Sequence, residues 1–251
     1  MNQYRYDNEV IWIIGASSGI GRALAGELSR RGATLALSAR RRESLDTLKE
    51  SLGEQHRIFV LDVTDSDLVI RTAYAIRAAF GHIDRIIFLA AAYTPMQIDK
   101  LDLAMTMHII DVNLLGAFHV VHAVLPILKE QQKGQLVLCG SVAGYTGLPG
   151  GQPYSATKAA IINLAESLRS ELPKHIQVKL INPGFVHSEL TDKNTFKMPK
   201  IISAERAANH IADGLQDSSF ELHFPKNFTV WLKFLRLLPY GVALKITKIF
   251  K

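Results

Sequence analysis

The chain has 251 residues, 48% of them hydrophobic and 21% charged, and its formal net charge is +6. This size and composition fit one globular α/β domain and exclude wholesale disorder and a fibrous class. The segment 225–251 contains six basic and no acidic residues, so the positive charge is local. A local charge argues against a protein-wide surface for nucleic acid, and we expect no nucleic-acid partner.

A single cysteine, Cys139, excludes an intramolecular disulfide and a thiolate metal cluster, and it indicates a reducing compartment. The N-terminal residues lack the basic and apolar regions of a secretory signal. No uninterrupted apolar run reaches the ~20 residues that a membrane span needs. The nine histidines show no metal-binding spacing. We therefore expect a cytoplasmic protein without a bound metal.

Short apolar runs alternate with helical patterns along most of the chain. Strands are predicted at 10–16, 33–39, 57–63, 83–91, 134–141, 176–184 and 220–224. Helices are predicted at 20–32, 42–52, 66–81, 101–130, 154–172 and 203–216. The strands are continuously apolar, as expected when helices cover both faces of a parallel sheet. The pattern predicts an α/β fold with a doubly wound, seven-stranded parallel sheet.

Three longer loops, 92–100, 143–153 and 185–202, each follow a strand at its carboxyl end. Ligands bind at this edge of open α/β sheets, so the loops predict a substrate cleft. Their apolar side chains suggest an apolar pocket, although ordinary packing would use the same residue types. These residues are Tyr93, Met96, Tyr145, Leu148, Phe185, Phe196 and Met198.

The glycine-rich turn "GASSGIG" lies between the first strand and the first helix and contains Gly15, Gly19 and Gly21. Such a turn lets the backbone approach a phosphate and directs a helix N-terminus at the anion. Ser17 and Ser18 can add hydroxyl donors. A loop that binds no ligand could have the same composition, but the position after the first strand favours a site for a dinucleotide pyrophosphate.

The second predicted strand ends in "SARRR", with Arg40 and Arg41 at the place where a dinucleotide's adenosine ribose would lie. An acidic residue here would favour NAD(H), whereas guanidinium groups suit a 2′-phosphate. We therefore expect NADP(H) rather than NAD(H); a solvated basic turn is the alternative. Asp62 and Val63 end the third strand and could border the adenine, or Asp62 could cap the next turn.

Five motifs together resemble the short-chain dehydrogenase/reductase superfamily: "GASSGIG", "DVN" at 111–113, "GS" at 140–141, "YSATK" at 154–158 and "NPG" at 182–184. Their order and spacing match that family over about residues 9–224. The resemblance implies a Rossmann-type fold and dehydrogenase or reductase activity. It also implies a catalytic group of Asn113, Ser141, Tyr154 and Lys158.

On a helix, Tyr154 and Lys158 share a face, and the ammonium should pull the tyrosine pKa down from about 10 towards working pH. Tyr154 would then exchange a proton with a substrate oxygen, and Ser141 would stabilise charge on the same oxygen. The resemblance further implies that Lys158 bonds the nicotinamide ribose. It also implies that Asn113 holds a water linking Lys158 to solvent.

The resemblance extends the cofactor site to further positions, and it has two departures. The expected cofactor-binding residues also include Ile20, Ala90, Pro183, Gly184, Val186 and Ser188. The family usually has two asparagines after the fourth strand, but here "FLAA" keeps only the small residues. A threonine commonly precedes the first glycine, and here it is Ile14. Neither change touches the proton-transfer group.

Residues 228–251 are predicted to form a basic, amphipathic helical extension beyond a catalytic domain at 1–227, with Pro239 ending its first helix. Two interpretations stay open. The extension could lie on an anionic bilayer at the inner membrane surface, which would indicate a lipid-like substrate. It could instead pack over the substrate cleft or a neighbouring subunit.

The leading hypothesis is an NADP(H)-dependent oxidoreductase acting on a carbonyl or alcohol substrate. A non-catalytic nucleotide-binding regulatory protein and an epimerase or dehydratase on the same fold are the alternatives. A homodimer or homotetramer is implied by the family resemblance alone.

Overall fold

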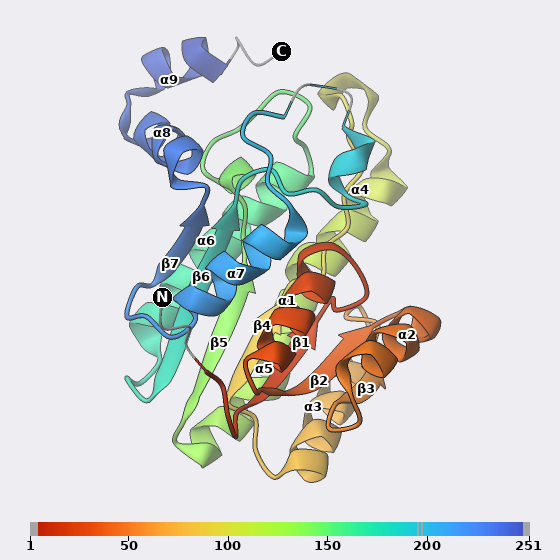
Figure 1. The fold of residues 1–251 in the computed structure, drawn as a ribbon. Coiled ribbons are helices and arrows are strands. Elements are labelled where there is room, and N and C mark those ends of the chain that lie inside the picture. Colours follow the sequence, from red (N-terminus) through yellow and green to blue (C-terminus); the bar gives the residue numbers. More distant parts are fainter. Residues whose placement is uncertain (1–4, 195, 197, 248–251) are drawn as a thin grey trace.

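The computed structural model describes residues 5–194, 196 and 198–247. Seven strands form one parallel sheet in the order β3-β2-β1-β4-β5-β6-β7 (Figure 1). The strands are β1 Val10–Ile14, β2 Thr34–Ala39, β3 Arg57–Val60, β4 Arg85–Phe88, β5 Gly134–Cys139, β6 Ile176–Pro183 and β7 Glu221–Phe224. The predicted Rossmann-type, doubly wound α/β fold is confirmed.

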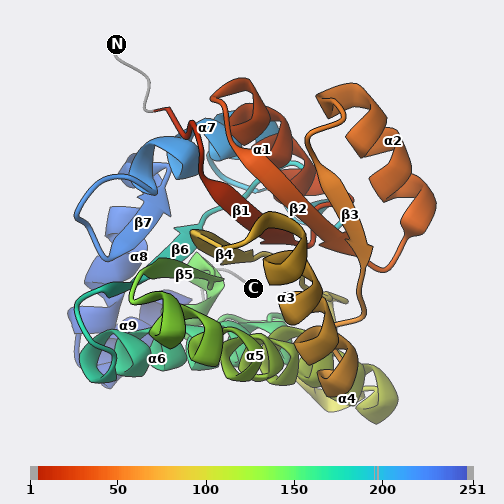
Figure 2. The same ribbon diagram turned by 90° about the horizontal axis from the view of Figure 1, so that it is seen from below.

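Helices cover both faces of the sheet, as Figure 2 shows. On one face lie α1 Gly19–Arg30, α2 Arg42–Leu52 and α7 Ala204–Gly214. On the other lie α3 Ser66–Phe80, α4 Leu103–Ile110, α5 Gly116–Gln131 and α6 Tyr154–Glu171. Every residue of β1 and of β5 is buried, since both faces of these central strands are covered. The two hydrophobic cores therefore lie above and below one sheet.

The strand order reverses between β1 and β4, which pair in parallel with Ile14 beside Phe88. From this point the chain winds in opposite directions, so the loops after β1 and β4 separate and leave a crevice at the carboxyl edge. The predicted site residues gather at this edge.

The long helix predicted at 101–130 is interrupted. A π-helical turn at Asp111–Leu115 separates α4 from α5. Such turns insert a residue into the helical ladder and frequently occur at functional sites. The whole stretch Leu103–Gln131 is the one helix among the described residues with the length and apolarity of a membrane span, and half of its most apolar window is buried in this structure. Helices in the core of a protein that does not span a membrane can have the same length and apolarity.

After β7 the chain forms α8 Lys226–Leu237 and α9 Tyr240–Thr247, so the two predicted helices divided by Pro239 are present. Thr229, Leu232 and Leu235 of α8 are buried, and both leucines join the core on the α6 side of the sheet. One face of α8 is therefore part of the fold.

The turn between β1 and α1 depends on two glycines. Gly15 has φ +97°, and a Cβ there would lie 2.7 Å from the backbone nitrogen of Ala90. A Cβ on Gly21 would lie 2.1 Å from the carbonyl oxygen of Gly15. Only glycine at position 21 lets α1 begin directly against this turn.

We predict opposite effects for two glycine-to-alanine substitutions in α1. Gly21→Ala forces the turn away from the helix and should lower the free energy of unfolding by about 1–3 kcal/mol. Gly26→Ala meets no atom within 4 Å and should raise it by about 0.5–1 kcal/mol, because alanine favours the helix. Urea unfolding of both variants provides the comparison. Equal effects of the two substitutions would contradict this account of the turn.

Candidate active site

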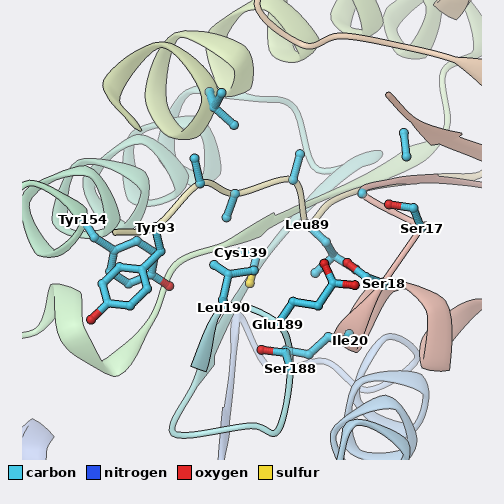
Figure 3. Close-up of a pocket in the computed structure, with 18 of the residues that line it drawn as sticks. Ser17, Ser18, Ile20, Leu89, Tyr93, Cys139, Tyr154, Ser188, Glu189 and Leu190 are labelled. Atoms are coloured by element: carbon cyan, nitrogen blue, oxygen red, sulfur yellow. The ribbon is translucent and has the colours of Figure 1, made fainter. Parts of the chain in front are cut away.

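A pocket of about 540 Å³ opens at the carboxyl edge of the sheet and extends from the glycine-rich turn to Tyr154. In Figure 3, Ser17 and Ser18 lie at one end, Tyr93 and Tyr154 at the other, and Cys139 between them. The lining includes the predicted residues Gly15, Ser17, Ser18, Gly19, Ile20, Gly21, Arg40, Arg41, Asp62, Val63, Ala90, Ser141, Tyr154, Lys158, Pro183, Gly184, Val186 and Ser188. Asn113 is the one predicted site residue that does not line the pocket.

The glycine-rich end is shaped to receive an anion. Helix α1 begins at Gly19, and its N-cap residue Ser18 makes no side-chain capping bond. The first turn contains no acidic residue. The N–H groups of this turn have no intrahelical partner, and the helix dipole makes their end of the helix positive. These features fit a dinucleotide pyrophosphate.

At the ribose end, Arg40 is exposed and lines the pocket. Arg41 forms a 3.4 Å ion pair with Glu189 of the loop after β6. Asp62 accepts hydrogen bonds from the backbone nitrogen and hydroxyl of Thr64, at 3.0 and 2.8 Å, so it caps its own turn while lining the pocket. Both interpretations of Asp62 are compatible with this position.

Tyr154 starts α6 and lies, half-buried, at the far end of the pocket. The ring packs edge-on against Tyr93, with centroids 5.0 Å apart. Tyr93 in turn donates a 2.7 Å hydrogen bond to Asn194, and its carbonyl accepts one from Lys193. These bonds join the loop after β4 to the loop after β6. The sequence placed Tyr93 in an apolar substrate loop, but its contact with Tyr154 carried no sequence signal.

Lys158 is 2% exposed, and its ammonium donates a 2.7 Å hydrogen bond to the carbonyl oxygen of Cys139 at the end of β5. The same nitrogen lies 5.5 Å from the centroid of the Tyr154 ring. A buried lysine needs such partners, because its charge has left water. The bond fixes the ammonium beneath the tyrosine and inside the pocket.

Asn113 lies in the π-helical turn and is fully buried. Its Nδ2 donates to the carbonyl of Ala92 at 3.0 Å and to the hydroxyl of Thr157 at 3.1 Å, while its Oδ1 accepts from the Ala92 nitrogen at 2.7 Å. Both amide donors are therefore engaged, and Oδ1 keeps one free lone pair. In this structure Asn113 positions the loop after β4 against α6.

Burial controls the titration of the buried pair. Burial raises the pKa of Tyr154 well above its ordinary value; Cys139 and Tyr93 add to this, and a hydrogen bond with the Ser141 hydroxyl opposes it. Burial also lowers the pKa of Lys158. The expected lowering of the Tyr154 pKa is therefore not met, because the loss of solvation has the largest effect on this pKa.

Ser141 ends β5 and begins a short turn. Its Oγ accepts a 3.1 Å hydrogen bond from the Ala143 nitrogen. Ser141 and Tyr154 line the same pocket, and the Ser141 hydroxyl is close enough to lower the pKa of Tyr154. In the part of the chain that the structure describes, no group of His, Cys, Asp and Glu side chains could hold a metal ion.

Comparison with known proteins decides the family. A sequence profile described as short chain dehydrogenase matches residues 9–198. The chain belongs to the short-chain dehydrogenase family. An uncharacterized oxidoreductase of Myxococcus xanthus is 35% identical over 231 residues, which cover 90% of this chain and 91% of that one. The chain is thus an oxidoreductase family member over nearly its whole length.

Solved structures agree with the fold of a short-chain dehydrogenase. A family member from Burkholderia phymatum, solved in complex with NAD, has a TM-score of 0.83 at 20% identity over 96% of each chain. An alcohol dehydrogenase from Thermococcus sibiricus, complexed with 5-hydroxy-NADP, has a TM-score of 0.78 at 28% identity, covering 86% of this chain and 95% of that one. Structural neighbours thus include proteins with either type of nicotinamide dinucleotide.

We predict that Lys158→Met changes how stability depends on pH. Because the folded pKa of Lys158 is lowered, the unfolded chain binds one more proton between that pKa and about 10.4, and stability from this group rises with pH. Relative to the variant, the wild type should gain up to about 1.4 kcal/mol per pH unit within this window.

Urea unfolding at a series of pH values below about 10.4 measures this difference. Lys129→Met, at an exposed position of α5, is the matched control and should follow the wild type. Parallel curves for the wild type and Lys158→Met would contradict a lowered pKa of Lys158 in the folded protein.

Proposed function

We propose that the protein is an NADPH-dependent reductase of a ketone or aldehyde, and equally a dehydrogenase of the corresponding alcohol. The observation that carries the proposal is one continuous pocket, with an exposed arginine pair and a glycine-rich helix start at one end. Its other end is lined by Ser141, Tyr154 and Lys158. A nicotinamide cofactor, when bound, supplies the hydride.

The residues of the chain would handle the proton and the oxygen. Tyr154 would donate its proton to the carbonyl oxygen during reduction, since its raised pKa keeps the phenol protonated at neutral pH. Ser141 would donate a hydrogen bond to the same oxygen as negative charge develops there. The Lys158 ammonium, held by the Cys139 carbonyl, would compensate charge on Tyr154 after the proton has left.

The residues fit the proposed cofactor. A side chain at Gly15 would collide with the backbone of Ala90, so glycine lets the turn pack closely against the end of β4, and both residues line the pocket. Arg40 would face the 2′-phosphate, with Arg41 as the second contact, and Asp62 and Val63 would border the adenine. Gly184, Val186 and Ser188 would line the nicotinamide end. This assignment favours NADP(H), and NAD(H) is the alternative.

The proposal also covers the domain organisation, the oligomeric state and the location of the protein. We propose one catalytic unit at 1–227 with an extension at 228–251, and a cytoplasmic homodimer or homotetramer in peripheral contact with the inner membrane surface. Lys233 of α8 pairs with Glu221 of β7, so the extension is fastened to the catalytic unit. A non-catalytic nucleotide-binding protein on this fold is the rival, and the next variant separates the two.

Tyr154→Phe should reduce kcat/KM for carbonyl reduction by about 100- to 10,000-fold, because it removes only the acidic proton. NADPH affinity should stay within about twofold, since the aromatic ring and its packing on Tyr93 remain. The measurement is NADPH oxidation with a carbonyl panel, beside equilibrium binding of NADPH. Tyr74→Phe, a partly exposed tyrosine of α3, is the matched control. Unchanged turnover in Tyr154→Phe would remove this residue from the chemistry.

Arg40→Ala should weaken NADPH binding by about 10- to 100-fold and leave NADH binding unchanged, because a charged hydrogen bond to the 2′-phosphate is lost. Arg42→Ala is the control, since Arg42 faces Asp46 of its own helix at 3.6 Å. Calorimetric titration of both variants with NADPH and NADH measures the effect. An equal loss for both cofactors would contradict a 2′-phosphate contact.

A further inference from the structure

Helices α8 and α9 carry many exposed apolar side chains. Of the fifteen large hydrophobic side chains that are exposed among the described residues, seven lie between positions 230 and 244. We call these seven the outer face: Val230, Trp231, Phe234, Leu237, Tyr240, Val242 and Leu244. Trp231 is 70% exposed and Leu237 81%. Exposed apolar groups gathered in this way mark an interaction surface.

The outer face is separate from the packing of α8 on the protein. Thr229, Leu232 and Leu235 recur at helical spacing and are buried against the core. The outer-face residues of α8 lie on the opposite side of the same helix. Packing of the extension on its own catalytic unit is thus accounted for by the inner residues, and it leaves the outer face in solvent.

Charge indicates what covers the outer face. The segment 225–251 has six basic and no acidic residues; among the described ones Lys226 and Lys245 are exposed, whereas Arg236 pairs with Glu166 of α6 at 4.0 Å. A second copy of this segment would bring like charges together, which opposes association. An anionic bilayer surface would attract the bases and accept the apolar side chains, with Trp and Tyr at the level of the headgroups.

The extension lies beside the substrate end of the pocket. Figure 1 shows α8 and α9 beyond the carboxyl end of β7. Phe228 of α8 packs on Phe185 with ring centroids 5.8 Å apart, and Phe185 packs on Phe196 at the same distance. Phe185 directly follows Gly184, which lines the pocket. An aromatic cluster therefore connects the first turn of α8 with the loop at 185–202.

A second contact reaches the other substrate loop. Lys233 forms an ion pair with Glu221, and the same carboxylate accepts hydrogen bonds from the Tyr145 hydroxyl and from Asn182. Tyr145 is buried at the start of the loop at 143–153, four residues after Ser141. Two of the three substrate loops, 143–153 and 185–202, are thus linked to α8.

We propose that the outer face docks on an anionic bilayer and that the substrate is an apolar carbonyl compound dissolved in that bilayer. The substrate assignment rests on the proposed reductase function, whereas the docking surface does not. Docking buries the outer face by roughly 5–10 Å and brings the loops attached to α8 to the lipid. An apolar substrate then reaches the pocket beside Phe185 without crossing water.

Sedimentation with vesicles tests the docking surface. Wild-type protein should sediment with vesicles of phosphatidylcholine and phosphatidylglycerol, less with phosphatidylcholine alone, and less at high salt. Trp231→Ser and Phe234→Ser should each weaken this binding by about tenfold, because each removes a buried aromatic ring. Tyr74→Ser, an exposed tyrosine on α3, is the control and should bind as the wild type does.

Vesicle binding that Trp231→Ser leaves unchanged would overturn the docking surface, as would no binding at all. Light scattering tests whether a second copy of the chain binds the outer face instead. A dimer or tetramer that Trp231→Ser dissociates would assign the outer face to a second copy and overturn the proposal as well.

A series of n-alkanals tests the substrate class, with vesicles present and NADPH oxidation as the readout. The wild type should show a rise in kcat/KM of about tenfold or more from hexanal to dodecanal. Trp231→Ser should keep its rate with hexanal and lose most of this rise. Reduction without any rise would overturn the substrate class and leave the reductase function in place. No NADPH oxidation with any carbonyl compound would overturn the reductase function itself, while vesicle binding would still uphold the docking surface.

Discussion

The side-chain amide of Asn113 is the interaction on which the geometry of the site depends. It bonds both backbone polar groups of Ala92 and the hydroxyl of Thr157, so it joins the loop after β4, the π-helical turn and α6. Because Thr157 also bonds the carbonyl of Tyr154, the same network fixes the start of the helix that carries the tyrosine. The asparagines that usually follow β4 in this family are absent here, and the bonds from Asn113 to the Ala92 backbone hold this loop without them.

Burial then decides the chemistry that this framework permits. Lys158 keeps its ammonium out of water through the Cys139 carbonyl, and Tyr154 keeps its proton because a phenolate would be poorly solvated. A site that holds its proton is suited to donate it when an oxygen beside Tyr154 and Ser141 gains negative charge. Because these groups are shielded from water, a charged or polar ligand that enters the pocket changes the pKa values of Tyr154 and Lys158. Ligand binding therefore affects proton transfer at Tyr154.

Much of the fold could be predicted from the sequence, because its signals are local. Continuous apolar strands alternating with helical patterns give the parallel sheet, and Pro239 divides the extension into two helices. The π-helical turn, the contact of Tyr93 with Tyr154 and the bond from Lys158 to Cys139 could not be predicted. Each depends on which atoms of distant segments approach one another. The expected direction of the Tyr154 pKa was wrong for this structure, since spacing along a helix shows a neighbouring charge and does not show burial.

We propose that a carbonyl carbon bound in this pocket receives a hydride from the nicotinamide while Tyr154 supplies the proton. The most direct measurement is a single turnover with NADPH that carries deuterium at its transferable position and an aldehyde as acceptor, followed by mass spectrometry of the product. The account predicts an alcohol with deuterium bound to the carbinol carbon and NADP⁺ free of it. Bound NADPH that keeps its deuterium with every aldehyde tried would contradict the claim and favour a nucleotide-binding protein without catalysis.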